Sequence, residues 1–191
     1  DNLLASYSLE RQPVFMSTSQ DFIGRMIRDD KAFGDTYAPQ RDKAAFEIAW
    51  AERAAGGNAD VTQYLPHYAG SPVVWGETGD HSGAVGAHMF KARPGYHLAP
   101  QPLASGVDLH TALGTGYALL SFDGDAAVAD AFRSAAAQRD LPFTVVIDAS
   151  HDAREAYGAR YVLVRPDLFV AWAGDAPEHP ADVILAKACG D

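Results

Sequence analysis

The sequence predicts a mixed α/β fold, with helices and a connector in its first half and an α/β sandwich with a mixed sheet in its second half. Three observations lead to this prediction. Apolar residues recur at helical spacing as far as about residue 55. Glycine and proline then divide the chain into short pieces as far as about residue 102. From residue 106 onward, short apolar runs alternate with helical patterns, as in strands that pack against helices.

The first half is expected to be mainly helical. The apolar pattern predicts helix over residues 2–30, either as two segments around Pro13 or as one kinked helix, because proline lacks the backbone donor of a helix interior. Residues 32–40 are predicted to form a loop. A second helix is predicted over residues 42–55, with the Gly-Gly-Asn sequence at 56–58 ending it.

The sequence predicts little regular structure for the middle of the chain. Prolines and glycines interrupt residues 59–82, where only Val73-Val74-Trp75 suggests a short strand. Residues 83–102 are rich in glycine, histidine and proline. We expect this part to be a connector that wraps over another surface rather than a domain of its own.

The second half shows an ordered series of strands and helices. The predicted elements are a buried strand at 117–122, an amphipathic helix at 126–139 with Val128, Ala131, Phe132 and Ala135 on one side, a second buried strand at 143–147, a short helix at 151–157, strands at 161–164 and 169–172 joined by a tight turn at 165–168, and a helix at 182–188. The strand–helix–strand start implies parallel pairing through a right-handed crossover. The closing hairpin adds an antiparallel pair, which gives the layout of a thioredoxin-like sandwich.

Composition excludes several classes of partner. The chain has 191 residues, of which 48% are hydrophobic, and it carries 25 acidic against 15 basic side chains, for a net charge of -10. This acidity disfavours nucleic acid and anionic membrane surfaces as partners. No apolar run approaches the roughly 20 residues that span a bilayer, and no secretory signal is present. The single cysteine, Cys189, allows no internal disulfide, which fits a cytoplasmic protein.

Three segments carry a resemblance to a known family. Residues 161–172 (Tyr-Val-Leu-Val-Arg-Pro-Asp-Leu-Phe-Val-Ala-Trp) resemble the Val-Leu-Val-Arg-Pro-Asp-Gly-His-Val-Ala-Trp motif of the group A flavoprotein aromatic hydroxylases, which include phenol, hydroxyphenylpropionate and polyketide hydroxylases. Residues 3–14 (Leu-Leu-Ala-Ser-Tyr-Ser-Leu-Glu-Arg-Gln-Pro-Val) resemble that family's Leu-Leu-x-Ser-Tyr-x-x-Glu-Arg-x-Pro-Val helix. Residues 113–120 are similar to the segment that opens its thioredoxin-like domain. The three motifs occur in the family's order and span almost the whole chain.

The resemblance implies that the chain is part of a longer protein and that its two segments belong to different domains. Residues 1–100 would complete the flavin and substrate domains and supply the connector, and residues 101–191 would form the thioredoxin-like domain. The parent enzyme would use FAD and NAD(P)H to hydroxylate a phenolic or related aromatic ring. The family's Gly-x-Gly-x-x-Gly segment is absent from this sequence, and so is the Gly-Asp flavin segment that normally just precedes the Leu-Leu-x-Ser-Tyr helix. No catalytic, cofactor-binding or metal residue is therefore assigned to this chain, and no cofactor is expected for it in isolation.

One segment departs from the family pattern. Where the family often shows Pro-Gly-x-Arg-x-Pro-His, this chain has Pro94-Gly95-Tyr96-His97-Leu98-Ala99-Pro100, with His97 in place of the arginine and the proline one residue late. This difference indicates a branch distinct from phenol hydroxylase, so that enzyme's substrate is not transferred to this chain.

Other residues of the chain suggest chemistry of their own. Seven histidines invite a metal site: His67, His81, His88, His97, His110, His151 and His179. None shows the i, i+4 pairing of a His-Glu-x-x-His helix, so surface or hydrogen-bonded histidines are the favoured interpretation, with His81 and His88 as the best remaining pair. No Gly-x-Ser-x-Gly segment supports a hydrolase. The glycines at 83–86 and 114–116 are interpreted as turn residues rather than phosphate loops.

Charged and aromatic residues in the motifs have structural interpretations as well as functional ones. Glu10 and Arg11 could form a functional pair, but an ion pair or hydrogen bonds that fix the helix against the FAD domain are favoured. Arg165-Pro166-Asp167 is expected to form a turn in which Asp167 bonds the local backbone. Trp172 is expected to pack in a core or an interface.

A thiol redox role finds little support. A thioredoxin-like enzyme carries its nucleophile at the start of the helix that follows the first strand. Here that position reads Asp123-Gly124-Asp125, whose carboxylates suit a helix start as caps. Cys189 would need a partner and a lowered pKa to act as a redox thiol.

Three hypotheses therefore stand. The first is the C-terminal part of a flavin monooxygenase, whose partner is the upstream FAD-binding portion of the same protein. The start at Asp1 without Met suggests a truncated chain or a proteolytic fragment. The second is a stand-alone thioredoxin-like binding or dimerisation module, and a homodimer is open under either hypothesis. The third is a thiol oxidoreductase that depends on Cys189.

Overall fold

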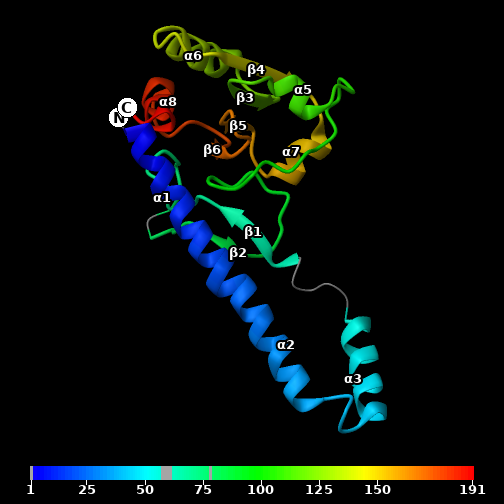
Figure 1. Cartoon of the computed structure of the whole chain (residues 1–191). Coiled ribbons are helices and arrows are strands. Elements are labelled where there is room, and N and C mark those ends of the chain that lie inside the picture. Colours follow the sequence, from blue (N-terminus) through cyan, green and yellow to red (C-terminus); the bar gives the residue numbers. More distant parts are fainter. Residues whose placement is uncertain (1, 57–61, 78) are drawn as a thin grey trace. The chain divides into compact units, whose positions relative to one another are not determined.

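The computed structural model describes residues 2–56, 62–77 and 79–191 (Figure 1). The chain forms two compact units, each made of more than one stretch of sequence. Unit 1 contains residues 1–11, 67–82 and 89–191, and unit 2 contains residues 12–66 and 83–88. The domain boundary expected near residue 100 stays a prediction.

A four-stranded mixed sheet forms the centre of unit 1. Its strands are β3 (Tyr117–Phe122), β4 (Phe143–Asp148), β5 (Tyr161–Val164) and β6 (Val170–Gly174), in the spatial order β4-β3-β5-β6. β3 runs parallel to β4, whereas β3 with β5 and β5 with β6 are antiparallel. The parallel crossover and the closing hairpin are thus both confirmed, and the chain has the mixed α/β fold that its sequence predicts.

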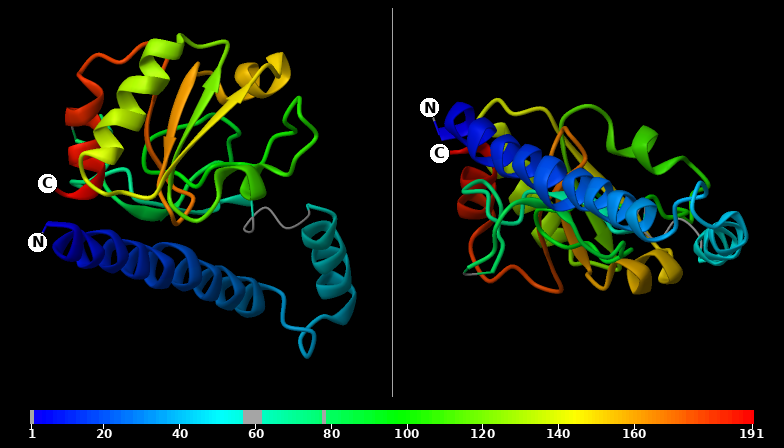
Figure 2. Two further views of the ribbon diagram at one scale, coloured as in Figure 1. Left: turned by 90° about the horizontal axis from the view of Figure 1, so that it is seen from above. Right: turned by 60° about the horizontal axis from the view of Figure 1, so that its bottom comes forward.

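Helices cover both faces of this sheet (Figure 2). On one face, α6 (Ala126–Ala137) and α8 (Ala181–Cys189) pack on Leu119, Leu163 and Trp172, which confirms that Trp172 is a core residue. On the other face, α5 (Leu109–Leu113) and α7 (His151–Tyr157) pack on a second core around Leu120 and Phe122. α5 is absent from the predicted elements because five residues are too few for a helical period to be recognised.

The apolar side of α6 differs slightly from the predicted one. Its buried residues are Ala129, Phe132, Ala135 and Ala136, whereas Val128 is half-buried and Ala131 is exposed. The short alanine side chain gives no signal of its own about which face is buried. Asp125 caps the helix as expected, because its side chain accepts a hydrogen bond of 2.8 Å from the backbone N–H of Ala127.

The two edges of the sheet differ in how far other segments of the chain cover them. At the β6 edge, the backbone N–H groups of Trp75 and Gly95 donate to the carbonyls of Ala171 and Val170, so loop segments cover that strand. β4 is the other edge and is only half-buried along most of its length, which corrects the prediction of a buried strand at 143–147. The run of apolar residues predicts a strand, but it does not tell whether a neighbour lies on both sides.

The predicted strand at residues 73–75 is wrong. Val73 and Val74 are buried, but they lie in a turn that begins at Ser71, whose Oγ accepts a hydrogen bond of 3.3 Å from the N–H of Val73. A side chain that bonds the local backbone favours a turn over an extended strand. Trp75 then bonds to β6 without becoming part of the named sheet.

Unit 2 consists mainly of helices and one small hairpin. α1 (Asn2–Ser17) begins in unit 1 and continues into a π-helical stretch, η1 (Thr18–Ile23), and then into α2 (Gly24–Thr36). The chain stays helical through Pro13, and helix extends six residues beyond the predicted end. The predicted loop at 32–40 is thus helical as far as Thr36, where an ion pair of 2.5 Å between Lys31 and Asp35 supports the last turn.

The remaining elements of unit 2 are short. α3 (Lys43–Ala55) confirms the second predicted helix, and Asp42 caps it by accepting from the N–H of Ala45. Residues 57 and 58 of the predicted helix stop lie outside the described part. β1 (Tyr64–His67) and β2 (Gly83–Val85) form a two-stranded sheet that the sequence does not reveal. Within the described ranges, no helix is both long enough and apolar enough to cross a membrane.

Candidate functional site

The best-developed polar site in unit 1 is a buried ion pair between α1 and the β5–β6 hairpin. Glu10 lies on α1 and is 4% exposed, and Arg165 follows β5 and is 8% exposed. The two terminal nitrogens of Arg165 donate to the two carboxylate oxygens of Glu10, with N–O distances of 2.5 and 3.0 Å. This fork-to-fork geometry is the strongest arrangement for an arginine and a carboxylate.

Three further residues complete the site. Ser71 donates its hydroxyl to Oε1 of Glu10 at 2.7 Å. Asp167 accepts from Nε and Nη2 of Arg165 at 3.1 and 2.8 Å. The guanidinium also lies over the ring of Tyr68, 5.7 Å from its centroid. The site therefore draws on three separate stretches of the sequence: α1, the turn at residues 68–71 and the hairpin.

Electrostatics keep the guanidinium of Arg165 charged. Burial on its own lowers the pKa of Arg165, but the hydrogen bonds and charges of Glu10 and Asp167 outweigh it and hold the pKa above its ordinary value. The two acidic residues and Ser71 occupy all three nitrogens of the guanidinium and both oxygens of Glu10. A group with its bonding positions filled in this way is suited to fixing structure, not to exchanging protons with a substrate.

The network tests two sequence predictions. Asp167 bonds the local backbone weakly, since the N–H of Phe169 reaches its Oδ1 at 3.4 Å, and its stronger bonds are to Arg165. Glu10 does fix its helix through an ion pair, but the partner is Arg165, whereas Arg11 lies over the ring of Tyr7 at 5.4 Å. In the sequence, Glu10 and Arg165 are linked only by lying in two motifs of the same resemblance, which does not identify them as partners.

A second cluster surrounds His67. Its ring is buried and stacks on Tyr96 with centroids 4.7 Å apart, and the guanidinium of Arg93 lies 4.7 Å from the same tyrosine ring. Asp80 pairs with Arg93 at 3.7 Å, and the ring of His81 lies 6.5 Å from that of His67. Burial and the neighbouring charges of His81 and Arg93 lower the pKa of His67, against the opposing effect of Asp80.

The histidines do not gather into a metal centre in the described part of the chain. No group of three or more His, Cys, Asp or Glu residues there could hold a metal ion. His81 and His88, the pair singled out from the sequence, belong to different units. His97 packs edge-on against Phe169, with ring centroids 5.5 Å apart. His179 stands beside Trp75 at 4.8 Å, so both of these histidines have aromatic neighbours.

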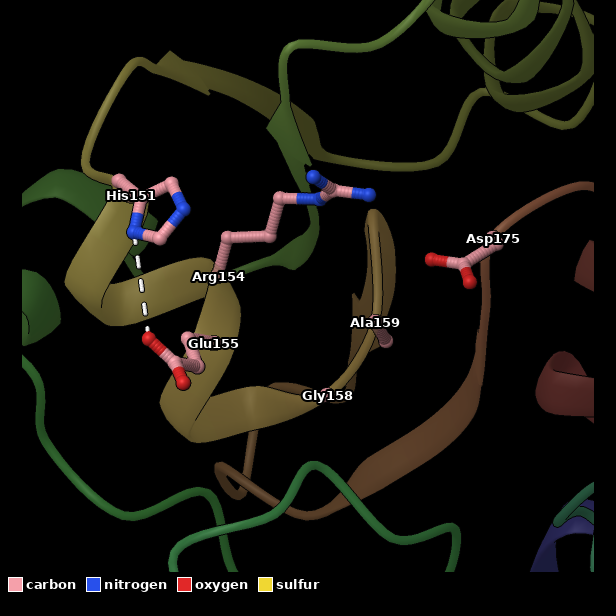
Figure 3. Close-up of a pocket in the computed structure, with 6 residues that line it drawn as sticks. All are labelled: His151, Arg154, Glu155, Gly158, Ala159 and Asp175. Carbon is pink, nitrogen blue, oxygen red and sulfur yellow. Dashed lines mark ion pairs between the residues drawn. The ribbon is translucent and has the colours of Figure 1, made fainter.

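A hollow of about 390 Å³ opens beside α7 and is lined by His151, Arg154, Glu155, Gly158, Ala159 and Asp175 (Figure 3). His151 and Glu155 face each other at 3.9 Å, but both side chains are about four-fifths exposed. Asp175 already accepts a hydrogen bond of 3.0 Å from the N–H of Arg160. Exposed groups of mixed charge in an open hollow give no preorganised binding geometry, so we assign it no ligand.

The thiol lies far from a redox geometry. Cys189 is half-buried at the end of α8, and burial raises its pKa above the ordinary value, with a hydrogen bond to Tyr117 acting in the opposite direction. The helix start that would carry a redox cysteine is instead occupied by the Asp125 cap. The glycines at 83–86 and 114–116 lie in or beside β2 and before β3, and neither stretch opens a long helix.

Comparison with known proteins agrees with this fold and with the motifs. The family model described as aromatic-ring hydroxylase, C-terminal, matches residues 91–191. This match covers more than half of the chain, which therefore belongs to the aromatic-ring hydroxylase C-terminal family.

Individual relatives support the same class. The FAD-dependent monooxygenase apdD of Emericella nidulans is 38% identical over 103 residues, which cover 51% of this chain and 16% of apdD. A structure of the rebeccamycin biosynthetic enzyme RebC with reduced flavin superimposes with a TM-score of 0.76 at 26% identity, covering 99% of this chain and 36% of RebC. The flavin-dependent monooxygenase PieE, in complex with FAD and substrate, shares the fold with a TM-score of 0.70 at 21% identity, over 98% of this chain and 40% of PieE.

The chain is much shorter than each of these relatives. It spans about a sixth of the length of apdD and about two-fifths or less of RebC and PieE. Nearly all of this chain, α1 to α8, thus has a counterpart in larger flavin-dependent proteins. The chain corresponds to one portion of a flavin-dependent aromatic hydroxylase-like protein.

Proposed function

We propose that this chain is the C-terminal part of an FAD- and NAD(P)H-dependent monooxygenase that hydroxylates a phenolic or related aromatic ring. In this proposal its role is structural: it completes the enzyme around the flavin portion and provides an interface, and it carries no catalytic or cofactor-binding residue. The observation that carries the proposal is the likeness to RebC, which extends over 99% of this chain. The proposed location is the cytoplasm.

The surface of α1 supports a partner from the same protein. Leu4, Tyr7 and Leu9 are 74%, 62% and 58% exposed, and Phe15, further along the helix, is 70% exposed. Large apolar side chains gathered on one helix are unusual on a free surface and mark a contact. The flavin-dependent relatives are much longer than this chain, so we assign these residues to contact with an upstream FAD-binding part of the same protein.

The Glu10–Arg165 pair explains how α1 would be held in place for contact with the upstream part. α1 carries the exposed apolar side chains on its surface and is fixed to the hairpin of the thioredoxin-like fold through Glu10. A charge pair that is fully hydrogen-bonded and buried has a defined geometry, which a purely apolar contact lacks. The pair would therefore hold α1 in the orientation that the upstream part requires.

The experiment compares the isolated chain with the product of the reading frame extended upstream. The isolated chain is expected to retain no flavin after purification and to show no tight FAD binding by calorimetry. The extended product is expected to be a yellow flavoprotein that oxidises NAD(P)H when phenolic compounds are added. Stoichiometric, tight binding of FAD by the isolated chain would overturn the claim that the flavin determinants lie upstream.

The alternative is a stand-alone thioredoxin-like binding or dimerisation module. The open β4 edge is the observation that favours it, since a module of this kind needs a pairing surface. It would be supported by a reading frame that begins near Asp1 and encodes no Gly-x-Gly-x-x-Gly or Gly-Asp flavin segment before it.

A further inference from the structure

His67 joins two segments of unit 1, residues 67–71 and 93–97. Its backbone forms an antiparallel bridge with that of Tyr96. Its ring lies almost parallel to the tyrosine ring, at an interplanar angle of 11° and with the centroids 4.7 Å apart. The same two residues thus make a backbone contact and a side-chain contact between the segments, and we call this junction the connector contact.

The connector contact accommodates the imidazole of His67 without a hydrogen bond at Nδ1. The residue is 7% exposed, and among the residues that the structure describes Nδ1 is buried and has no partner. An imidazolium carries a donor on both ring nitrogens, and its charge would have to be withdrawn from water, which costs far more than burial of the neutral ring. The surroundings of His67 therefore suit its neutral form.

The charges around the ring also oppose a positive His67. The ring of His81 lies 6.5 Å from that of His67, and the guanidinium of Arg93 lies over the far tyrosine, 4.7 Å from the centroid of Tyr96. Asp80 is the acidic group among these neighbours, but it already pairs with Arg93 at 3.7 Å and accepts a backbone hydrogen bond of 3.1 Å. Burial, and then the charges of His81 and Arg93, lower the pKa of His67, and Asp80 only partly opposes them.

We propose that His67 is an acid-sensitive latch, whose protonation opens the connector contact while the central sheet stays folded. The protonated ring would lie beside the charges of His81 and Arg93, without an acceptor at Nδ1 in the described part of the chain. Separation of residues 67–71 from residues 93–97 relieves both costs, because the ring then reaches water.

The connector contact can open by itself because few bonds hold it. The backbone N–H of Tyr68 donates to the carbonyl of Gly95 at 2.7 Å, and that of Gly95 donates to Val170 of β6 at 2.8 Å. The central sheet is held instead by continuous strand pairing and by a core on each face. Regions with few bonds open at a lower free energy than the core of a fold. Opening therefore uncovers the β6 edge and leaves β3, β4 and β5 paired.

The latch does not rest on the proposed function, since it depends only on contacts within unit 1. Amide hydrogen exchange of the 191-residue chain, followed by NMR between about pH 7.5 and about pH 4.5, tests it. Protection of the Tyr68 and Gly95 amides, corrected for the intrinsic pH dependence of exchange, is expected to fall at least about tenfold more than that of the β3 amides. Equal losses at both places would indicate global destabilisation and would overturn the latch, as would protection that does not change with pH.

His67→Phe separates protonation from stacking. Phenylalanine keeps an aromatic ring against Tyr96 but takes up no proton, so the connector contact should stay protected in acid. His97→Gln is the matched control, because His97 belongs to the same segment but packs on Phe169. This control should lose protection in acid as the unsubstituted chain does. Loss of protection in His67→Phe, or its retention in His97→Gln, would show that His67 is not the latch.

His81→Gln tests the latch without a change in His67 itself. His81 is exposed, so its substitution is compatible with the fold. Its removal takes away a charge that lowers the pKa of His67, so His67 gains its proton more readily. The midpoint at which the Tyr68 and Gly95 amides lose protection should therefore move to higher pH. A midpoint that stays in place or moves to lower pH would contradict the proposal, since a purely structural role of His67 predicts no upward shift.

Discussion

Glu10 and Arg165 are separated by 155 positions in sequence, yet they form a doubly hydrogen-bonded ion pair that is almost wholly buried. A buried pair of this kind gains little over apolar packing of the same shape, but the loss of one partner leaves an uncompensated charge in the interior. The pair therefore contributes mainly by making one orientation of α1 on the hairpin strongly preferred. Its contribution can be measured directly.

Removal of either charge should destabilise the fold strongly. Glu10→Met and Arg165→Met are each expected to lower the free energy of unfolding by about 3 kcal/mol, because each leaves the other charge buried with an incomplete set of partners. The double variant should lose clearly less than the sum of the two, since no unpaired buried charge remains between these positions. Urea denaturation of the four proteins gives the coupling energy.

The matched control for this cycle is Glu47 on α3. Its side chain is 64% exposed and lies 3.7 Å from Lys43, so Glu47→Met should change stability by no more than about 0.5 kcal/mol. An additive cycle at Glu10 and Arg165 would show that the two residues do not act as a pair.

The glycine of the Pro94-Gly95 sequence is predicted to be required by its surroundings as well as by its backbone angle. Gly95 has a φ of +84°, and an added Cβ would lie 2.5 Å from the backbone of Ala69. Gly106 has a similar φ of +71° but no atom within 4 Å of such a Cβ. Gly106→Ala should cost about 1 kcal/mol of stability, from the backbone angle alone. Gly95→Ala should cost at least about 2 kcal/mol more, because backbone atoms must move apart. Thermal unfolding of both variants gives the difference, and equal losses would show that the close approach to Ala69 relaxes without cost.

The sequence predicts an element well where the signal is local and poorly where it is not. The apolar run of β3 and the amphipathic pattern of α6 are properties of adjacent residues, and both elements were predicted within two residues of their ends. The apolar run of β4 predicts a buried strand, because apolar residues do not reveal whether a second neighbour exists. The sequence does not show that Arg165 is the partner of Glu10. That contact depends on how α1 meets a hairpin at the far end of the chain, and a single sequence carries no direct record of such a meeting.

The buried His67 should make stability depend on pH. Its pKa is lowered in the folded chain, first by burial and then by the charges of His81 and Arg93, from an ordinary value of 6.5. Between that value and the lower folded one, the unfolded chain binds more protons than the folded chain. The free energy of unfolding therefore falls as the pH drops from about 7 through this window. Urea denaturation at several pH values measures the slope.

Replacement of the histidine tests its part in that slope. His67→Gln removes the titrating group and should flatten the dependence on acid, even though the loss of stacking on Tyr96 lowers stability at every pH. His151→Gln is the control, because the side chain of His151 is 81% exposed. A slope that survives His67→Gln but disappears with His151→Gln would assign the acid sensitivity to the surface beside α7.

The thiol of Cys189 is predicted to be unreactive in the folded chain, which bears on the thiol oxidoreductase hypothesis. Burial raises its pKa, so the reactive thiolate is scarce near neutral pH, and the side chain is half-buried. A disulfide reagent should modify it at least about tenfold more slowly in the folded chain than in urea. Cys189→Ala should leave the fold intact and remove no reductase activity, because none is expected of the unsubstituted chain. Measurable reduction of a protein disulfide by the chain, lost in Cys189→Ala, would restore the hypothesis and would require the thiolate to be stabilised by a partner outside α8.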